Sequence, residues 1–156
     1  MIEVKIPGRG LIQLQHLVCD INGTLALDGQ LLPGLATSLP RLRDGLSIHL
    51  RTADSYGGAE DIGRRLGLPV TVIGGSDEPD PKTAFVEQLG AANVVAVGQG
   101  ANDRGMLAAA IIGIAVLSPE GLSLAALEAA DLIVPDIQRA LELLESPLRM
   151  VASLRT

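Results

Sequence analysis

Short apolar runs recur along this chain, and each is followed by a segment with the spacing of a helix. The runs are residues 16–19, 46–50, 69–73, 94–97, 112–117 and 132–134. Runs so short and so uniformly apolar are typical of strands buried on both faces of a parallel sheet. The helical segments are residues 34–44, 55–66, 81–90, 102–111, 119–130 and 136–145. This alternation predicts right-handed βαβ crossovers and an α/β fold with a doubly wound, Rossmann-like parallel sheet.

The predicted helices carry recognisable end signals. Pro81 and Pro119 fit first-turn positions, where the missing N–H needs no partner, and Gly67 and Gly90 fit C-terminal stops. Before the core, residues 2–6 and 11–15 alternate apolar and polar around a Pro-Gly-Arg-Gly turn, which predicts a β-hairpin.

The length of 156 residues is that of one domain. We expect a single unit made of three consecutive parts. These parts are an N-terminal β-hairpin (1–15), the core (16–145) and a short C-terminal helix (146–156).

Composition excludes several classes of partner. Tyr56 and Phe85 are the only aromatic residues, and the formal net charge is −6, so neither base stacking nor binding to a phosphate backbone is favoured. We expect no nucleic-acid partner. Cys19 is the only cysteine, which excludes an internal disulfide and favours a reducing compartment. Apolar stretches such as 111–117 are far shorter than the ~20 residues that cross a bilayer, and residues 1–7 alternate apolar and polar instead of showing the long apolar core of an export signal. We therefore expect a cytoplasmic protein with no membrane partner.

Polar residues gather where the predicted strands end. These positions are Asp20, Thr52, the region 77–82 and the region 98–103. Because parallel strands deliver their carboxyl ends to one edge of the sheet, these groups should converge on one crevice.

The same positions form four motifs in a fixed order. They are Asp20-Ile21-Asn22-Gly23-Thr24, then Thr52-Ala53-Asp54, then Lys82 within residues 81–86, and finally Gly98-Gln99-Gly100-Ala101-Asn102-Asp103. Over roughly residues 16–135 this order resembles the four signatures of the haloacid dehalogenase (HAD) superfamily. The phosphorylation domain of P-type ATPases is the most similar group, since D-I-N-G-T, T-A-D and G-Q-G-A-N-D stand where it has D-K-T-G-T, T-G-D and G-D-G-x-N-D.

The resemblance implies a free-standing relative of that domain and not a pump. The stretch between Thr24 and Leu46 is too short for the nucleotide-binding domain of the ATPases, and neither 25–45 nor 55–80 can hold a cap domain. In relatives, an open site without a cap is associated with large substrates or with homo-oligomers in which a neighbouring subunit closes the crevice. Here the N-terminal hairpin could form such a subunit contact.

The implied chemistry is hydrolysis of a phosphorylated substrate. Asp20 would attack phosphorus to form an aspartyl-phosphate, Thr52 would bond a phosphoryl oxygen, and Lys82 would offset its charge. Backbone N–H groups of the first motif would add an anion cradle. The predicted phosphate-binding residues are Gly23, Thr24, Thr52, Ala53 and Lys82.

Mg²⁺ is the expected cofactor. Its predicted ligands are Asp20, the main-chain carbonyl of Asn22, Gln99 and Asp103, with Asn102 in support. Asn22 and Gln99 stand where hydrolytic relatives usually carry carboxylates. An amide cannot act as general acid or base, a function worth about 10²–10⁴-fold, so turnover should be slow and magnesium affinity weak.

A second hypothesis therefore stays open, that of a catalytically impaired regulatory or phosphate-binding module. Individual residues also have structural interpretations. Asp54, Asn102 and Asp103 could cap helices, the acidic residues at 77, 78 and 80 could form a solvated loop, and Arg104 could either contact a phosphate or solvate a helix.

Other residues favour structural roles over chemistry. Gly98-x-Gly100 is a weak dinucleotide signal because Asp103 replaces the third glycine of that motif. His16 and His49 are expected as core or edge residues. Cys19 should point to the opposite face of its strand from Asp20.

Overall fold

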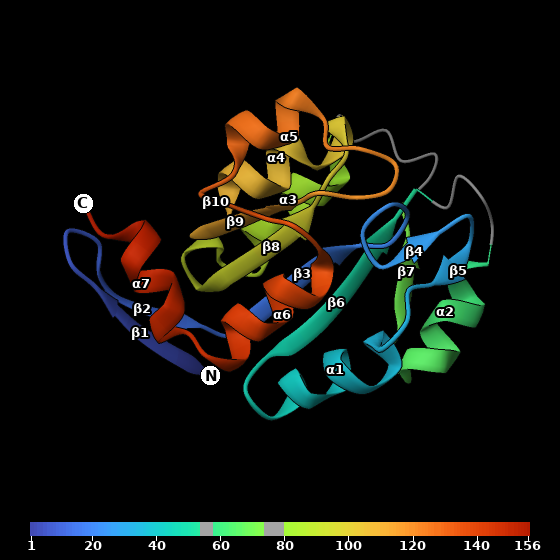
Figure 1. The fold of residues 1–156 in the computed structure, drawn as a ribbon, viewed down its shortest axis with the longest axis horizontal. Coiled ribbons are helices and arrows are strands. Elements are labelled where there is room, and N and C mark those ends of the chain that lie inside the picture. Colours follow the sequence, from blue (N-terminus) through green and yellow to red (C-terminus); the bar gives the residue numbers. More distant parts are fainter. Residues whose placement is uncertain (54–57, 74–79) are drawn as a thin grey trace.

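A six-stranded parallel sheet forms the centre of the protein, as seen in a computed structural model that describes residues 1–53, 58–73 and 80–156 (Figure 1). In sheet order the strands are β10 (Leu132–Val134), β9 (Ile112–Val116), β8 (Val94–Gly98), β3 (His16–Asp20), β6 (Ser47–Thr52) and β7 (Val70–Val72). The chain runs outward from β3 to β7, then returns to β8 on the other side of β3 and continues to β10. This confirms the predicted doubly wound sheet and sets its switch point beside the carboxyl end of β3.

Helices cover both faces of the sheet. The α-helices are α1 (Leu35–Arg41), α2 (Ala59–Leu66), α3 (Pro81–Gln88), α4 (Arg104–Ala109), α5 (Leu124–Ala129), α6 (Ile137–Glu145) and α7 (Leu148–Leu154). Short 3₁₀ turns are η1 (Leu42–Asp44), η2 (Ala91–Asn93) and η3 (Ala101–Asp103). α3, α4 and α5 pack side by side on one face, whereas α1, α2 and α6 lie on the other (Figure 1).

Alternating side chains of the strands feed two separate cores. Leu17 and Cys19 of β3 pack into the larger core with α1, α2 and α6, whereas Val18 packs into the smaller core beneath α3 and α4. Branched aliphatic side chains and alanines fill both cores with hardly any aromatic contribution. The alternation places Cys19 and Asp20 on opposite faces, as predicted, because the Asp20 side chain bonds to α3.

The N-terminal hairpin is confirmed as strands β1 (Ile2–Ile6) and β2 (Gly10–Leu14), paired antiparallel. Val4, Ile6, Ile12 and Leu14 belong to the larger core, and β1 packs against α7. The hairpin is thus part of the packed structure, with its other face left exposed. A second, smaller hairpin, β4 (Ala26–Leu27) and β5 (Gln30–Leu31), lies between β3 and α1.

Most predicted ends agree with the structure. Pro81 begins α3, Gly67 ends α2 with a φ of 61°, and Gly90 follows α3 with a φ of 84°. The predicted helix 55–66 begins at Ala59 in the described residues, and 55–57 lie outside them.

The prediction of a helix from Pro119 is wrong. Residues 118–121 form a turn closed by the Gly121 N–H, which donates to the Ser118 carbonyl, and α5 begins only at Leu124. The Ser123 hydroxyl accepts the Ala125 N–H and so caps α5. Ser123 is therefore the true start signal, because a side-chain oxygen at this position satisfies a first-turn donor.

None of the helices in the described ranges has the length and apolarity needed to cross a bilayer.

Candidate active site

The carboxyl ends of three adjacent strands bring the predicted residues together. Asp20 ends β3, Thr52 ends β6 and Gln99 follows β8, so the strand order alone makes them neighbours. They line one pocket of about 220 Å³, whose walls are Asp20, Asn22, Thr52, Ala53, Gln99, Asn102 and Glu120.

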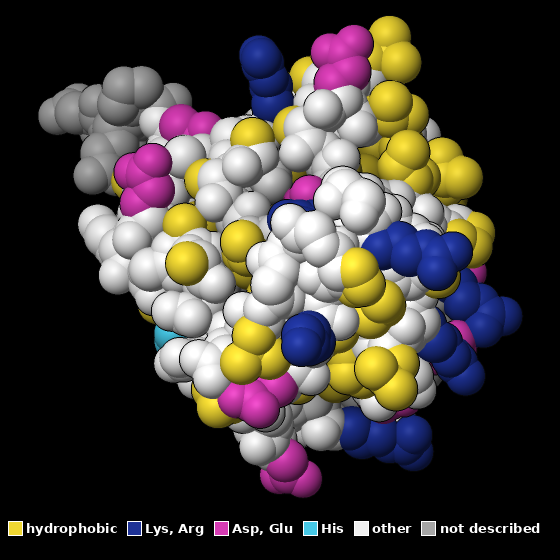
Figure 2. Space-filling view, turned by 90° about the vertical axis from the view of Figure 1, so that its left-hand side faces the viewer, with side chains coloured by type: hydrophobic (Ala, Val, Ile, Leu, Met, Phe, Trp, Pro, Cys, Tyr) yellow, Lys and Arg dark blue, Asp and Glu magenta, His cyan; other side chains and the backbone are white. Residues whose placement is uncertain are grey.

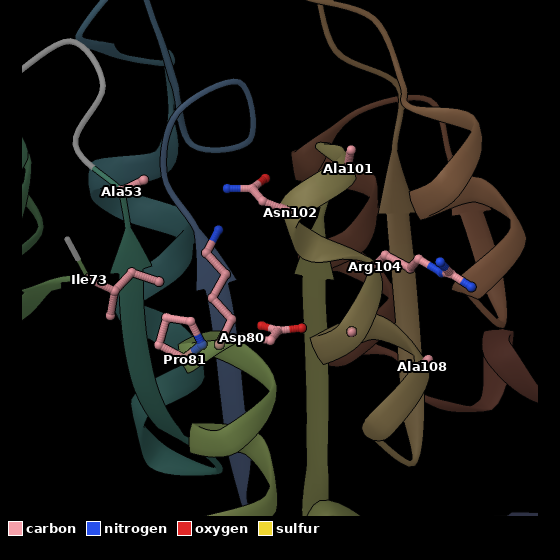
Figure 3. A pocket seen from close by; sticks show the side chains of 10 residues that line it. Ala53, Ile73, Asp80, Pro81, Ala101, Asn102, Arg104 and Ala108 are labelled. Carbon is pink, nitrogen blue, oxygen red and sulfur yellow. The ribbon is translucent and has the colours of Figure 1, made fainter. Parts of the chain in front are cut away.

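A larger cavity of about 590 Å³ lies next to this pocket and shares Ala53 and Asn102 with it. Figure 3 shows Asn102 pointing into this cavity and Arg104 extending away from it. Ile73, Pro81 and Ala108 supply apolar walls, and Asp80 lies near the floor. The two cavities therefore adjoin each other at the carboxyl edge of the sheet.

A buried lysine lies between two carboxylates at the base of the site. Lys82 Nζ is 2.6 Å from Asp20 Oδ1 and 2.6 Å from Asp103 Oδ1. The exposed fractions of Lys82, Asp20 and Asp103 are 1%, 5% and 0%. α3 holds Lys82 in place, because Asp80 caps this helix by accepting the Thr83 N–H at 3.1 Å.

Burial and the neighbouring charges shift the pKa of Asp20 and that of Lys82. Desolvation and the neighbouring Asp103 raise the pKa of Asp20 above its usual range, and Lys82 opposes the rise only in part. Burial acts to lower the pKa of Lys82, but the two carboxylates outweigh it and raise that pKa above its ordinary value. Lys82 therefore remains an ammonium ion and holds one charge between two acids.

Asp103 is fully engaged by its surroundings. Its Oδ1 accepts from Lys82, and its Oδ2 accepts the backbone N–H groups of Gln99 and Gly100, each at 2.9 Å. A side chain held this way positions Lys82 and fixes the loop after β8. Serving as a magnesium ligand, the role predicted for it, would require Asp103 to share or give up these bonds.

The turn after β3 orients the first motif. The Thr24 hydroxyl donates to Asp20 Oδ2 at 3.2 Å, and the Asn22 amide donates to the Thr52 hydroxyl at 3.2 Å. Thr52 is completely buried, and it lines the pocket together with Asn22, to which it is hydrogen-bonded.

Two of the predicted phosphate donors are already occupied. The Gly23 N–H donates to the Ala26 carbonyl at 2.7 Å, and the Thr24 N–H donates to the Ile21 carbonyl at 3.1 Å. An anion would therefore have to share these N–H groups with the turn in three-centre hydrogen bonds. The Thr24 contribution in this arrangement comes from its hydroxyl, through Asp20.

The donor set of the pocket fits a hard divalent cation. Asp20 offers a carboxylate, Asn22 a backbone carbonyl and Gln99 an amide, and Gln99 Nε2 lies 3.4 Å from the Asn22 carbonyl oxygen. Among the described residues no group of three His, Cys, Asp or Glu side chains is placed to hold a metal ion, so a cation here would also need the Asn22 carbonyl and the Gln99 amide. Oxygen donors with room for water are what Mg²⁺ requires.

Glu120 is the pocket residue that the sequence did not reveal. It lies in the turn after β9, a segment predicted as helix, and its side chain lines the same pocket as Asp20 and Gln99. Glu120 lies in a turn at the carboxyl end of the strand next to β8, and this position is the signal from which its role could have been predicted.

Some predicted residues lie elsewhere. Asp54 and the acidic positions 77 and 78 are outside the described residues. His16 Nδ1 lies 3.2 Å from His49 Nε2, and the His49 ring meets Phe85 edge-on. This pair is half-buried among strand and helix side chains, as expected of structural residues.

Comparisons with known proteins agree with this architecture. No protein-family model matches the chain. The sequence is 36% identical over 124 residues, 76% of this chain, to the Mycobacterium tuberculosis protein named "Probable cation-transporting P-type ATPase J". The chain spans only 18% of that relative's length.

Solved structures show the same fold at low identity. A Legionella pneumophila protein described as a HAD superfamily hydrolase of subfamily III A has a TM-score of 0.70 at 17% identity, over 90% of this chain and 87% of that one. The 3-deoxy-D-manno-octulosonate 8-phosphate phosphatase of Moraxella catarrhalis, solved with magnesium and phosphate, has a TM-score of 0.69 at 20% identity, over 90% of both chains. The predicted HAD fold is confirmed.

Proposed function

We propose that this chain, which has the haloacid dehalogenase fold, is a magnesium-dependent phosphohydrolase that acts through an aspartyl-phosphate. The observation that carries the proposal is the buried Asp20–Lys82–Asp103 arrangement, in which a lysine is held at 2.6 Å from the carboxylate at the switch point of the sheet. A buried carboxylate with its own cation beside an open cavity is suited to attack an anionic phosphorus centre.

In the first step an Asp20 oxygen bonds to phosphorus while the bond from phosphorus to the leaving oxygen breaks. Lys82 keeps its proton and offsets charge on the phosphoryl oxygens, and the Thr52 hydroxyl, oriented by Asn22, donates to one of them. In the second step water attacks the aspartyl-phosphate, which regenerates Asp20 and releases phosphate.

Asp20, the Asn22 carbonyl and Gln99 would hold Mg²⁺ at the mouth of the pocket. When bound, the cation screens the charges of the carboxylate and the phosphate from each other. Asp103 contributes by holding Lys82 and the Gln99 loop in place.

Turnover should be slow, because Asn22 can neither protonate the leaving group nor take a proton from water. Substrates whose leaving group departs without a proton, such as acyl and aryl phosphates, should therefore react best. The adjoining cavity of about 590 Å³ suits a substrate larger than its phosphate, or one that a neighbouring copy of the chain helps to enclose.

The test is phosphorylation by ³²P-labelled acetyl phosphate with Mg²⁺, measured with hydrolysis of p-nitrophenyl phosphate. We expect wild-type protein to incorporate label and Asp20→Asn to incorporate none. Asp44→Asn is the matched control, since Asp44 is exposed in η1, away from the pocket. Stoichiometric labelling of Asp20→Asn would overturn the nucleophile assignment.

The second candidate is a phosphate-binding or regulatory module, favoured by the neutral amides at Asn22 and Gln99. The paired variant Asn22→Asp with Gln99→Asp separates the two. A phosphohydrolase should gain turnover when both acids are restored, by up to about 10²–10⁴-fold from the acid–base group alone. Phosphate binding without hydrolysis, in wild type and in this variant, would favour the module.

A further inference from the structure

We propose that Glu120 supplies the carboxylate that Gln99 lacks, as a ligand of the divalent cation at this site. The inference rests on the magnesium dependence proposed above. It assigns a residue that lies in none of the four motifs.

The turn that carries Glu120 is fixed against the site. The Glu120 N–H donates to the Ser118 hydroxyl at 3.0 Å and the Gly121 N–H to the Ser118 carbonyl at 2.8 Å. Two residues later, the Ser123 N–H donates to the Gln99 carbonyl at 3.0 Å. The turn and the loop after β8 are thus tied together, and Glu120 is held beside Gln99.

The side chains of Glu120 and Gln99 converge over Gly23. Glu120 Oε2 lies 2.6 Å from the point that a Cβ on Gly23 would occupy, and Gln99 Nε2 lies closer still to that point. Gly23 also has a φ of +79°, which only glycine adopts readily. The absence of a side chain at Gly23 therefore leaves the space that the carboxylate and the amide occupy, and the amide there lies 3.4 Å from the Asn22 carbonyl oxygen.

The charges around the pocket favour a cation there. Asp20 and Glu120 both line it, and no Lys or Arg stands among its described lining residues. Lys82 below is already shared by Asp20 and Asp103. Within the described part of the chain the Glu120 carboxylate makes no hydrogen bond or ion pair, so it is available as a ligand.

The resulting donor set suits Mg²⁺. Two carboxylates, one backbone carbonyl and one amide oxygen, completed by water, match the few protein ligands with which this ion is usually bound. Rotation of the Gln99 side-chain amide by about 180° brings its Oε1 to the position of Nε2, where this oxygen can face the cation.

The test measures metal affinity in the full chain without substrate. Mn²⁺ is the probe, titrated and counted as free ion by electron paramagnetic resonance, with circular dichroism to confirm that each variant is folded. Glu120→Gln should raise the Kd for Mn²⁺ at least about tenfold, the lower end of what even outer-shell changes cause at metal sites. Glu128→Gln on α5 is the matched control, exposed and absent from the pocket lining, and should leave the Kd unchanged.

A rescue variant makes the result specific. In the Gln99→Asp background the missing acid is restored, so adding Glu120→Gln should raise the Kd less than it does in the wild type. If Glu120→Gln raises the Kd for Mn²⁺ equally in the wild-type and the Gln99→Asp backgrounds, the proposal that Glu120 compensates for Gln99 is overturned.

The remaining outcomes separate this inference from the proposed function. A Kd in Glu120→Gln within twofold of wild type, with weaker binding in Asp20→Asn, overturns the role of Glu120 and leaves the phosphohydrolase intact. If Glu120→Gln changes the pH profile of hydrolysis but leaves the Kd for Mn²⁺ unchanged, the metal-ligand role is also overturned, since Glu120 would then take part in proton transfer. Failure of wild-type protein to bind Mn²⁺ at millimolar concentration overturns both proposals.

Discussion

Replacing Lys82 by Met removes the ammonium group that pairs with two buried carboxylates. Met has a similar length and fills most of the same space, so the change removes charge more than volume. Asp20 and Asp103 would then share a site with exposed fractions of 5% and 0%, each having lost a bond of 2.6 Å. Breaking a buried ion pair by removing one partner costs about 3–5 kcal/mol, because the remaining charge is left uncompensated.

That loss is a large part of the about 5–15 kcal/mol by which a domain is stable. With a urea m-value of about 2 kcal/mol/M, it lowers the unfolding midpoint by about 1.5–2.5 M. The measurement is urea denaturation at pH 7, followed by circular dichroism. Lys5→Met is the matched control, since Lys5 is exposed on β1 and forms no ion pair within the described ranges.

A second variant tests the cause of the loss. The double variant Lys82→Met with Asp20→Asn removes one of the two carboxylates left without a cation. The double variant should therefore be more stable than Lys82→Met alone. A midpoint for Lys82→Met within about 0.5 M of wild type, which is about 1 kcal/mol at that m-value, would refute the account of a charge-paired core.

Further predictions concern three other residues. Burial raises the pKa of the Cys19 thiol, so Ellman's reagent should find no reactive thiol in the native protein and one in urea; fast native labelling would contradict the burial. Burial, then His16 and Arg51, lower the pKa of His49 below its ordinary 6.5. The unfolded state therefore binds more protons, and the free energy of unfolding falls as the pH drops below about 6.5. In urea titrations at about pH 5–7, His49→Gln should make this fall shallower. An equally steep fall in the variant would count against the role of His49. Gly23→Ala should cost at least about 1–2 kcal/mol from its left-handed φ. Its Cβ would also displace the side chains of Gln99 and Glu120, so Mn²⁺ binding should weaken, whereas an unchanged Kd would show that the space over Gly23 is not used.

The architecture was predictable because its signals are local and repeated. Each buried strand must be apolar on both faces, and a parallel pair must be joined by a crossover, so six apolar runs separated by helical segments leave few alternatives. Asp20 and Thr52 were predictable for the same reason, since a polar residue that ends a buried strand lies at the carboxyl edge of the sheet.

What the sequence did not reveal depends on contacts between distant segments. The two carboxylate bonds of Lys82 join residues 62 and 21 positions apart, and no spacing rule identifies such a pair. The Gly23 and Thr24 N–H groups were predicted as donors to a phosphate, but the turn uses them itself, which only its folded geometry reveals. Glu120 was hidden because residues 119–130 have helical spacing, whereas the turn at Gly121, with a φ of 94°, delays α5 to Leu124.

The location of Glu120 has a consequence for metal affinity. Gln99 directly follows a strand, and its backbone N–H is bonded to the buried Asp103, so an acid at Gln99 would be held in place before the cation arrives. Glu120 is exposed in a turn, and its longer side chain loses rotamer freedom on binding, which costs up to about 1.5–2 kcal/mol. A carboxylate supplied from the turn should therefore bind more weakly than one supplied from the strand end. Gln99→Asp should accordingly tighten Mn²⁺ binding beyond wild type even with Glu120 present, and a looser complex in that variant would mean that two acids repel each other there more than they bind the ion.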